Sequence, residues 1–276
     1  MQTDGPTTAS PIFERRCGWS EFHRTIDEIK MGIPRDEASI LFRGQSNSEW
    51  PLSTSLERAT NFRKDMTLQR YYSIAERQIK EVQSVTGKRW GWQECQQESN
   101  GTILHVANLE YLTYLRHHGF PSPLLDWSRS PYVAAFFAFC DAVAGSGGWV
   151  AVYVLVNWRR SIGWAGAPVI WRTGDYLTTD DRHYRQQSDY TIAYRGGYRS
   201  VDGALARDLL LPHEDVAEAS VSIPQHGNDL YKVMMPAADR SKALTYFMEH
   251  NINRHTLYGD EDSFVKSLGD VEFLEP

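Results

Sequence analysis

Hydrophobic residues recur at helical spacing in several stretches of the chain. In residues 68–82 they stand at positions i, i+3, i+4, i+7, i+11 and i+14, with charged and amide side chains between them. This spacing puts the apolar side chains on one face and predicts an amphipathic helix. Shorter patterns predict a helix with Ser20 as N-cap that ends at Gly32, a helix over residues 104–115, and a helix over residues 238–248 with Asp239 as its cap.

Unbroken apolar runs are typical of strands that are covered on both faces. Residues 38–42 form a short run that stops before Gly44, and residues 149–156 form a longer one. Residues 190–194 and 230–235 predict further strands. Ser130 and Pro131 are typical of a helix start, and residues 133–143 are apolar on almost every side. We therefore expect this helix to be buried against the strands near residues 42–43 and 149–156.

No internal repeat, glycine-rich nucleotide loop or linker-like segment divides the chain. We expect the α+β class, as a single mixed α/β domain over residues 15–276 with small sheets and surrounding helices. Residues 1–14 are rich in threonine, proline and other small or polar residues, and we expect a disordered tail there.

Composition narrows the class of protein. The 276 residues are 41% hydrophobic and 23% charged, with a formal net charge of −6. These values are typical of soluble globular proteins and exclude collagen, coiled coils and wholesale disorder. The negative charge gives no support for a large phosphate-binding surface. No apolar run approaches the ~18 residues of a membrane helix, so we expect no membrane partner. Three cysteines, far apart, argue against a disulfide framework and favour a cytoplasmic location.

Arg43 is the first candidate for chemistry. It follows the apolar strand predicted at residues 38–42, where an arginine must keep its charge hydrated or paired. Its planar guanidinium is suited to hold a phosphate or carboxylate through two hydrogen bonds. The alternative is a structural ion pair with one of the 35 acidic residues.

Residues 116–128 are the second candidate, because they carry two histidines, two serines and Asp126 into a proline-rich loop. A Ser/His/Asp triad is one interpretation, although the chain has no nucleophile elbow of the GxSxG type. A zinc site of His117, His118 and Asp126 is another, but it lacks the histidine spacing of HExxH. The structural alternative is that Asp126 caps backbone amides while Trp127 packs in the core.

Residues 182–191 combine basic side chains with two glutamines, Gln186 and Gln187. Such a cluster is typical of a solvated loop. If the glutamines instead face a cleft, they supply hydrogen bonds without charge.

The order of these motifs resembles the FRG domain family. That family has an F-R-G tripeptide on an early strand, and later an H-x-G-x-P-S-x-L-L-D-W-S-x-S-P stretch followed by an A-x-F-F-A helix. The resemblance covers residues 19–268. The matching residues are Phe42, Arg43, Gly44, His117, Gly119, Pro121, Ser122, 124–128, 130–131 and 135–138.

The layout of the family is in turn similar to that of ADP-ribosyltransferase-like toxins, and this similarity implies an NAD site. It implies that Arg43 holds a phosphate or the nicotinamide ribose, that Ser128 takes the position of the serine, and that Gln187 stands near the usual catalytic glutamate. Glutamine cannot ionise, so it cannot stabilise an oxocarbenium ion as a carboxylate does. The implied cofactor site also includes Gly44, His117, Asp126 and Trp127. It includes no metal.

Three functions compete. The first is an NAD-dependent ADP-ribosyltransferase or NAD-cleaving enzyme of the bacterial toxin or phage-defence type, with a protein or nucleic acid as acceptor. The second is a non-catalytic module that binds a nucleotide or a protein partner through the Arg43/Asp126 cleft. The third is a nuclease or other hydrolase that uses His117 and Asp126. An acid close to Arg43 and Ser128 in space favours the enzyme, and its absence favours the module.

Overall fold

The computed structural model describes residues 12–34, 36–61, 65–93, 107–142, 148–158, 168–173, 177, 181–195, 209–221 and 229–273. The strands in these ranges are β1 (Ile12–Arg16), β2 (Ala38–Gln45), β3 (Leu125–Ser128), β4 (Trp149–Trp158), β5 (Pro168–Arg172), β6 (Ser188–Arg195), β7 (Leu209–Leu210) and β8 (Asp229–Pro236). The helices are α1 (Trp19–Met31), α2 (Ser55–Ala59), α3 (Leu68–Thr86), α4 (Leu109–His117), α5 (Pro131–Cys140), α6 (Asp181–Arg185), α7 (His213–Val221), the 3-10 turn η1 (Ala237–Asp239), α8 (Arg240–Glu249), α9 (Arg254–Tyr258) and α10 (Glu261–Glu272).

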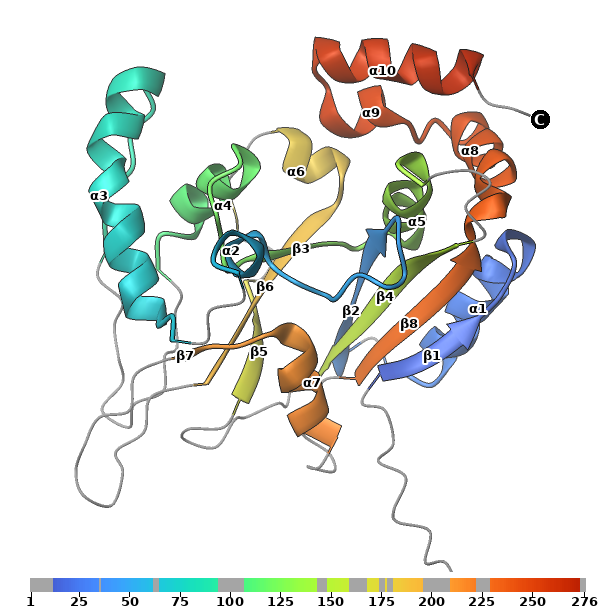
Figure 1. Ribbon diagram of the computed structural model, residues 1–276, viewed down its shortest axis with the longest axis horizontal. Helices are drawn as coiled ribbons and strands as arrows, with labels where there is room; N and C mark the ends of the chain where they lie inside the picture. The colour runs from blue at the N-terminus through green and yellow to red at the C-terminus, as the bar shows by residue number, and fades with distance from the viewer. Residues whose placement is uncertain are drawn as a thin grey trace, which may run out of the picture.

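The strands form one mixed sheet. Their order in the described ranges is β1-β8-β4-β2-β3-β6-β5, with β7 paired to β6. β1 and β8 run parallel, and the other pairs are antiparallel. Figure 1 shows α1, α5 and α8 near the β8 side and α3 and α4 beyond β6. The expected mixed α/β fold is confirmed, but one eight-stranded sheet replaces the small sheets that we expected.

The core is organised around β4, which is covered on both faces. Val150 and Val152 pack with residues of α1, α5 and α8. Ala151 and Tyr153 point the other way and pack with residues of α7. This alternation explains why β4 is an unbroken apolar run in the sequence. A separate apolar cluster joins α3 and α4 to β6.

The helix α5 begins where the sequence predicts. The side chain of Ser130 accepts a hydrogen bond from the Val133 amide at 3.3 Å, and Pro131 occupies the first turn. Val133 and Phe136 are buried, whereas Phe137 is partly exposed. β2 pairs with β4, and α5 packs on both strands, as we expected.

One expected helix cap is wrong, and the other is confirmed in position but makes no side-chain capping bond. α1 begins at Trp19 with Gly18 as N-cap, and the Gly18 amide donates to Glu21. Asp239 is the N-cap residue of α8, as expected, but its carboxylate makes no capping hydrogen bond there and instead accepts one from the Trp19 amide at 2.9 Å. A long-range acceptor therefore satisfies the start of α1, and the local cap at Ser20 is not needed.

Two further boundaries differ from those that we expected. β1 begins at Ile12, so residues 12–14 belong to a strand rather than to a disordered tail, and residues 1–11 lie outside the described residues. The helix expected over residues 104–115 begins at Leu109, and residues 104–106 lie outside the described residues. Among the helices that the structure describes, none is both long and apolar enough to cross a membrane.

Candidate functional site

β2 and β3 are neighbours in the sheet, but they pair only at Phe42 and Ser128. On their other sides, β2 pairs along its whole length with β4, and β3 pairs along its whole length with β6. Because Ser128 is the last residue of β3, the two strands are unpaired over the rest of β3, from Leu125 to Trp127. Arg43 bridges the separation, because its Nη1 donates a hydrogen bond to the backbone oxygen of Asp126 at 2.8 Å.

A pocket of about 220 Å³ lies where the strands separate, and we call it the β2/β3 pocket. Five of the seven predicted site residues line it: Arg43, Gly44, Asp126, Trp127 and Ser128. The other lining residues come from β2, β6, α9, and from α5 and α6 with the residues that directly follow these two helices. They are Phe42, Ala134, Phe137, Asp141, Arg182, Gln186, Ser188 and Tyr258.

Both carboxylates that line the β2/β3 pocket are paired with arginines that do not line it. Asp126 accepts a hydrogen bond from Arg116 at 2.5 Å. Asp141 accepts one from Arg254 at 2.7 Å. The negative charge of each carboxylate is therefore offset from outside the pocket.

The two arginines that line the pocket have no such partner in the part of the chain that the structure describes. Among the described residues, neither Arg43 nor Arg182 forms an ion pair with a carboxylate. The guanidinium of Arg182 lies over the ring of Tyr258, 4.4 Å from its centroid. The lining thus carries two positive and two negative side chains, and of these four only the negative ones form ion pairs with described residues.

The surroundings of Arg43 disfavour the charged form of its guanidinium. Burial lowers the pKa of Arg43 to about 10, Asp126 opposes this change, and the positive charges of Arg116 and Arg58 add to it. Arg43 nevertheless remains protonated at neutral pH. Its Nε is buried without a hydrogen-bond partner among the described residues. An anion in the pocket would compensate this concentration of positive charge.

Gly44 is required by the packing of α5 on β2. A Cβ atom at this position would lie 1.9 Å from the backbone oxygen of Ala134 and 2.6 Å from the amide nitrogen of Ala138. The glycine of the F-R-G tripeptide thus allows close contact between helix and strand, and this contact forms one wall of the pocket.

The hydroxyl of Ser128 is occupied by two backbone contacts. Its Oγ donates to the Gln186 oxygen at 2.8 Å and accepts from the Ser130 amide at 3.0 Å. Trp127 is 3% exposed and packs in the core, with its indole donating to Thr191 at 2.7 Å. These contacts give Ser128 a role in positioning the start of α5 and Trp127 a role in the core.

His117 and Gln187 are the two predicted site residues that do not line the pocket. His117 Nε2 lies 2.8 Å from the hydroxyl of Tyr190, which pairs with Asp126 across β3 and β6. Gln187 has a φ of 49° and an exposed side chain. The neighbouring Gln186 lines the pocket in its place, with its amide donating to the Leu257 oxygen at 3.2 Å.

Sequence reasoning missed part of the lining. The basic, glutamine-containing stretch at residues 182–191 was a signal for Arg182 and Gln186. Tyr258 carried no such signal, because α9 reaches the pocket only through tertiary packing, and Asp141 stood out in the sequence only as the polar end of the apolar run before it. In the described ranges, no group of three or more His, Cys, Asp or Glu side chains is arranged to hold a metal ion.

Residues 38–146 match the family model of the FRG domain. This match supports the FRG resemblance, but it covers less than half of the chain and not the 19–268 that we expected. The matched segment supplies Arg43, Asp126 and Ser128, whereas Arg182 and Tyr258 lie beyond it. No curated protein and no solved structure matches the chain. No comparison supports the further similarity to ADP-ribosyltransferase-like toxins.

Proposed function

We propose that this chain binds a phosphate-bearing nucleotide, of which NAD is the first to test, in the β2/β3 pocket. One observation carries the proposal. The lining acids Asp126 and Asp141 are paired with outside arginines, while Arg43 and Arg182 keep positive charge on the lining. A pocket lined by two arginines that have no carboxylate partner among the described residues favours a phosphate.

The rest of the lining suits the sugar or base next to that phosphate. Phe137 and Tyr258 stand edge to face, with ring centroids 6.1 Å apart, and present apolar surface to the pocket. At about 220 Å³, the pocket is smaller than the ~300–1,000 Å³ that is common for small-molecule sites. It therefore encloses one end of a dinucleotide, and the other end lies along the surface.

Asp126 favours a second candidate function, cleavage of NAD. It places a carboxylate on the pocket lining beside Arg43 and Ser128, and its Oδ1 is buried without a hydrogen-bond partner among the described residues. A carboxylate beside the ribose can stabilise the oxocarbenium-like transition state when nicotinamide leaves. The ADP-ribosyl group that remains would then pass to water or to an acceptor.

Calorimetric titration with NAD tests the binding. Arg43→Lys keeps a charge but loses the planar fork, so we expect NAD affinity to fall about 10- to 150-fold. Arg77→Lys is the matched control, because Arg77 is exposed on α3 and does not line the pocket, and we expect no change. A folded wild-type protein that binds no NAD contradicts the proposal, and so does an equal loss in both variants.

Nicotinamide release separates the enzyme from the binding module. If the chain cleaves NAD, we expect Asp126→Asn to lower turnover by about 100-fold or more while NAD still binds. If the wild type binds NAD but releases no nicotinamide, with or without a protein or nucleic-acid acceptor, the chain is a non-catalytic module.

A further inference from the structure

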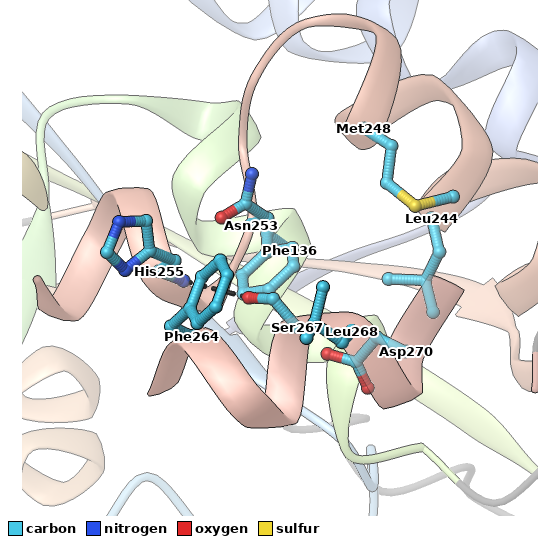
Figure 2. Close-up of a pocket in the computed structure, with 9 residues that line it drawn as sticks. All are labelled: Phe136, Leu244, Met248, Asn253, His255, Phe264, Ser267, Leu268 and Asp270. Atoms are coloured by element: carbon cyan, nitrogen blue, oxygen red, sulfur yellow. Dashed lines mark hydrogen bonds between the residues drawn. The ribbon is translucent and has the colours of Figure 1, made fainter. Parts of the chain in front are cut away.

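A second pocket lies among α5, α8, α9 and α10, and it shares no lining residue with the β2/β3 pocket. Its volume is about 390 Å³, and we call it the α8/α10 pocket. Figure 2 shows Leu244 and Met248 of α8 on one side, Phe264 of α10 on the other, and Phe136 of α5 between them. Phe136 and Leu244 are each 2% exposed and form its floor.

Three of the four polar side chains that line this pocket are engaged in hydrogen bonds, and the His255 ring packs edge-on against Phe264. Ser267 Oγ accepts a hydrogen bond from the His255 amide at 2.9 Å, the interaction drawn in Figure 2. Asp270 accepts a hydrogen bond from Arg254 at 2.7 Å. The side chain of Asn253 caps α9 through the Thr256 amide. The pocket therefore offers a ligand mainly apolar contact, and the one carboxylate of its lining, Asp270, is paired with Arg254.

The wall formed by α10 leaves apolar surface in contact with water. Phe264 is 46% exposed and Leu268 is 51% exposed, one helical turn apart on the pocket side of α10. A molecule in the pocket would cover both side chains, and burial of apolar surface would drive its binding.

We propose that the α8/α10 pocket binds an uncharged aromatic or aliphatic small molecule. Its volume lies within the ~300–1,000 Å³ that is usual for such sites. The concave shape with a buried floor favours a small molecule over the flat contact of a protein partner. The proposal concerns a site separate from the β2/β3 pocket and does not depend on nucleotide binding.

The test uses N-phenyl-1-naphthylamine, an uncharged aromatic probe whose fluorescence increases in apolar surroundings. We expect the full chain to bind it saturably at one site. Leu268→Glu puts a charge on the pocket wall at a half-exposed position, so we expect the dissociation constant to rise at least about tenfold. Val265→Glu is the matched control on the same helix; Val265 is 61% exposed and does not line the pocket, and we expect less than about a twofold change.

Thermal unfolding of both variants, with melting temperatures close to that of the wild type, shows that the loss is local. No saturable binding by the wild type overturns the proposal, and so does an equal loss in the two variants. Light scattering at the probe concentration gives a further check. A wild-type dimer that Leu268→Glu dissociates would mean that a second copy covers the pocket, and this result would also overturn the proposal.

Discussion

At the residue scale, the positive charge of Arg43 also affects His213, which does not line the β2/β3 pocket. His213, at the start of α7, is 1% exposed and lies 2.8 Å from the Thr191 hydroxyl through its Nε2. Burial and the positive charge of Arg43 lower the pKa of His213 to about 3. His213 is therefore neutral in the folded protein, and Arg43 keeps its charge beside an imidazole that does not compete for an anion.

The difference between the pKa of His213 in the unfolded chain and in the folded protein predicts how stability depends on pH. In the unfolded chain His213 takes up a proton as the pH falls below about 6.5, whereas the folded chain does so only near pH 3, so acid favours unfolding. From pH 7 to pH 5, we expect this residue alone to reduce the free energy of unfolding by about 2 kcal/mol. His213→Gln keeps a partner for Thr191 but cannot titrate, so urea unfolding at the two pH values should show a smaller difference. An unchanged difference would contradict the prediction.

At the element scale, the contact between β2 and α5 joins the fold to the site. α5 starts at the Ser130 cap, directly after β3, and packs on β2 over Gly44. The strand β2 holds Arg43 immediately before this contact. The helix therefore fixes the position of the F-R-G tripeptide relative to β3, and a change in this contact moves one wall of the β2/β3 pocket.

Gly44→Ala tests this contact. The added methyl group would meet backbone atoms of Ala134 and Ala138 rather than a flexible side chain. We expect the free energy of unfolding to fall by about 1–3 kcal/mol. Gly269→Ala is the control, because Gly269 is within α10 and a methyl group added there would meet no atom within 4 Å, and it should stabilise the protein by about 0.5–1 kcal/mol. Chemical denaturation of both variants measures the two changes, and a Gly44→Ala protein as stable as the wild type would contradict the prediction.

Sequence could predict the elements whose signals lie within a few neighbouring residues. The cap at Ser130, the apolar run of β4 and the spacing of α3 each depend on neighbouring residues, and the structure contains all three. The cap expected at Ser20 is wrong, and Asp239 occupies the N-cap of α8 without a side-chain capping bond, because its carboxylate contacts the Trp19 amide from 220 positions away. No local pattern contains that contact.

At the scale of the whole molecule, the β2/β3 pocket is built from two parts of the chain. The segment that matches the FRG model supplies Arg43 and Asp126, and the motif pattern was sufficient to predict that they come together. The opposite side comes from α6 and α9, through Arg182 and Tyr258. Sequence alone could not place Tyr258, because its position depends on how the C-terminal helices pack on α5.

Arg254 is the main polar link in that packing. Its guanidinium donates to Asp141 and to the Cys140 oxygen at the end of α5, and to Asp270 on α10. Burial lowers the pKa of Arg254, but the hydrogen bonds that it donates to Asp141 and Asp270 outweigh this and raise it overall. One side chain thus connects Asp141 of the β2/β3 pocket with Asp270 of the α8/α10 pocket.

Arg254→Met should loosen the C-terminal helices from the rest of the molecule. Methionine keeps much of the apolar stem but leaves Asp270 without its charged partner, so we expect the free energy of unfolding to fall by about 1–3 kcal/mol. Hydrogen exchange should accelerate in residues 254–272 and remain unchanged in β4, because β4 is covered by other helices as well. Arg24→Met is the control, since the ion pairs of Arg24 with Glu21 and Glu28 are exposed on α1 and should contribute little. Equal exchange in the two variants, or acceleration spread evenly over the sheet, would show that Arg254 does not hold α9 and α10 in place.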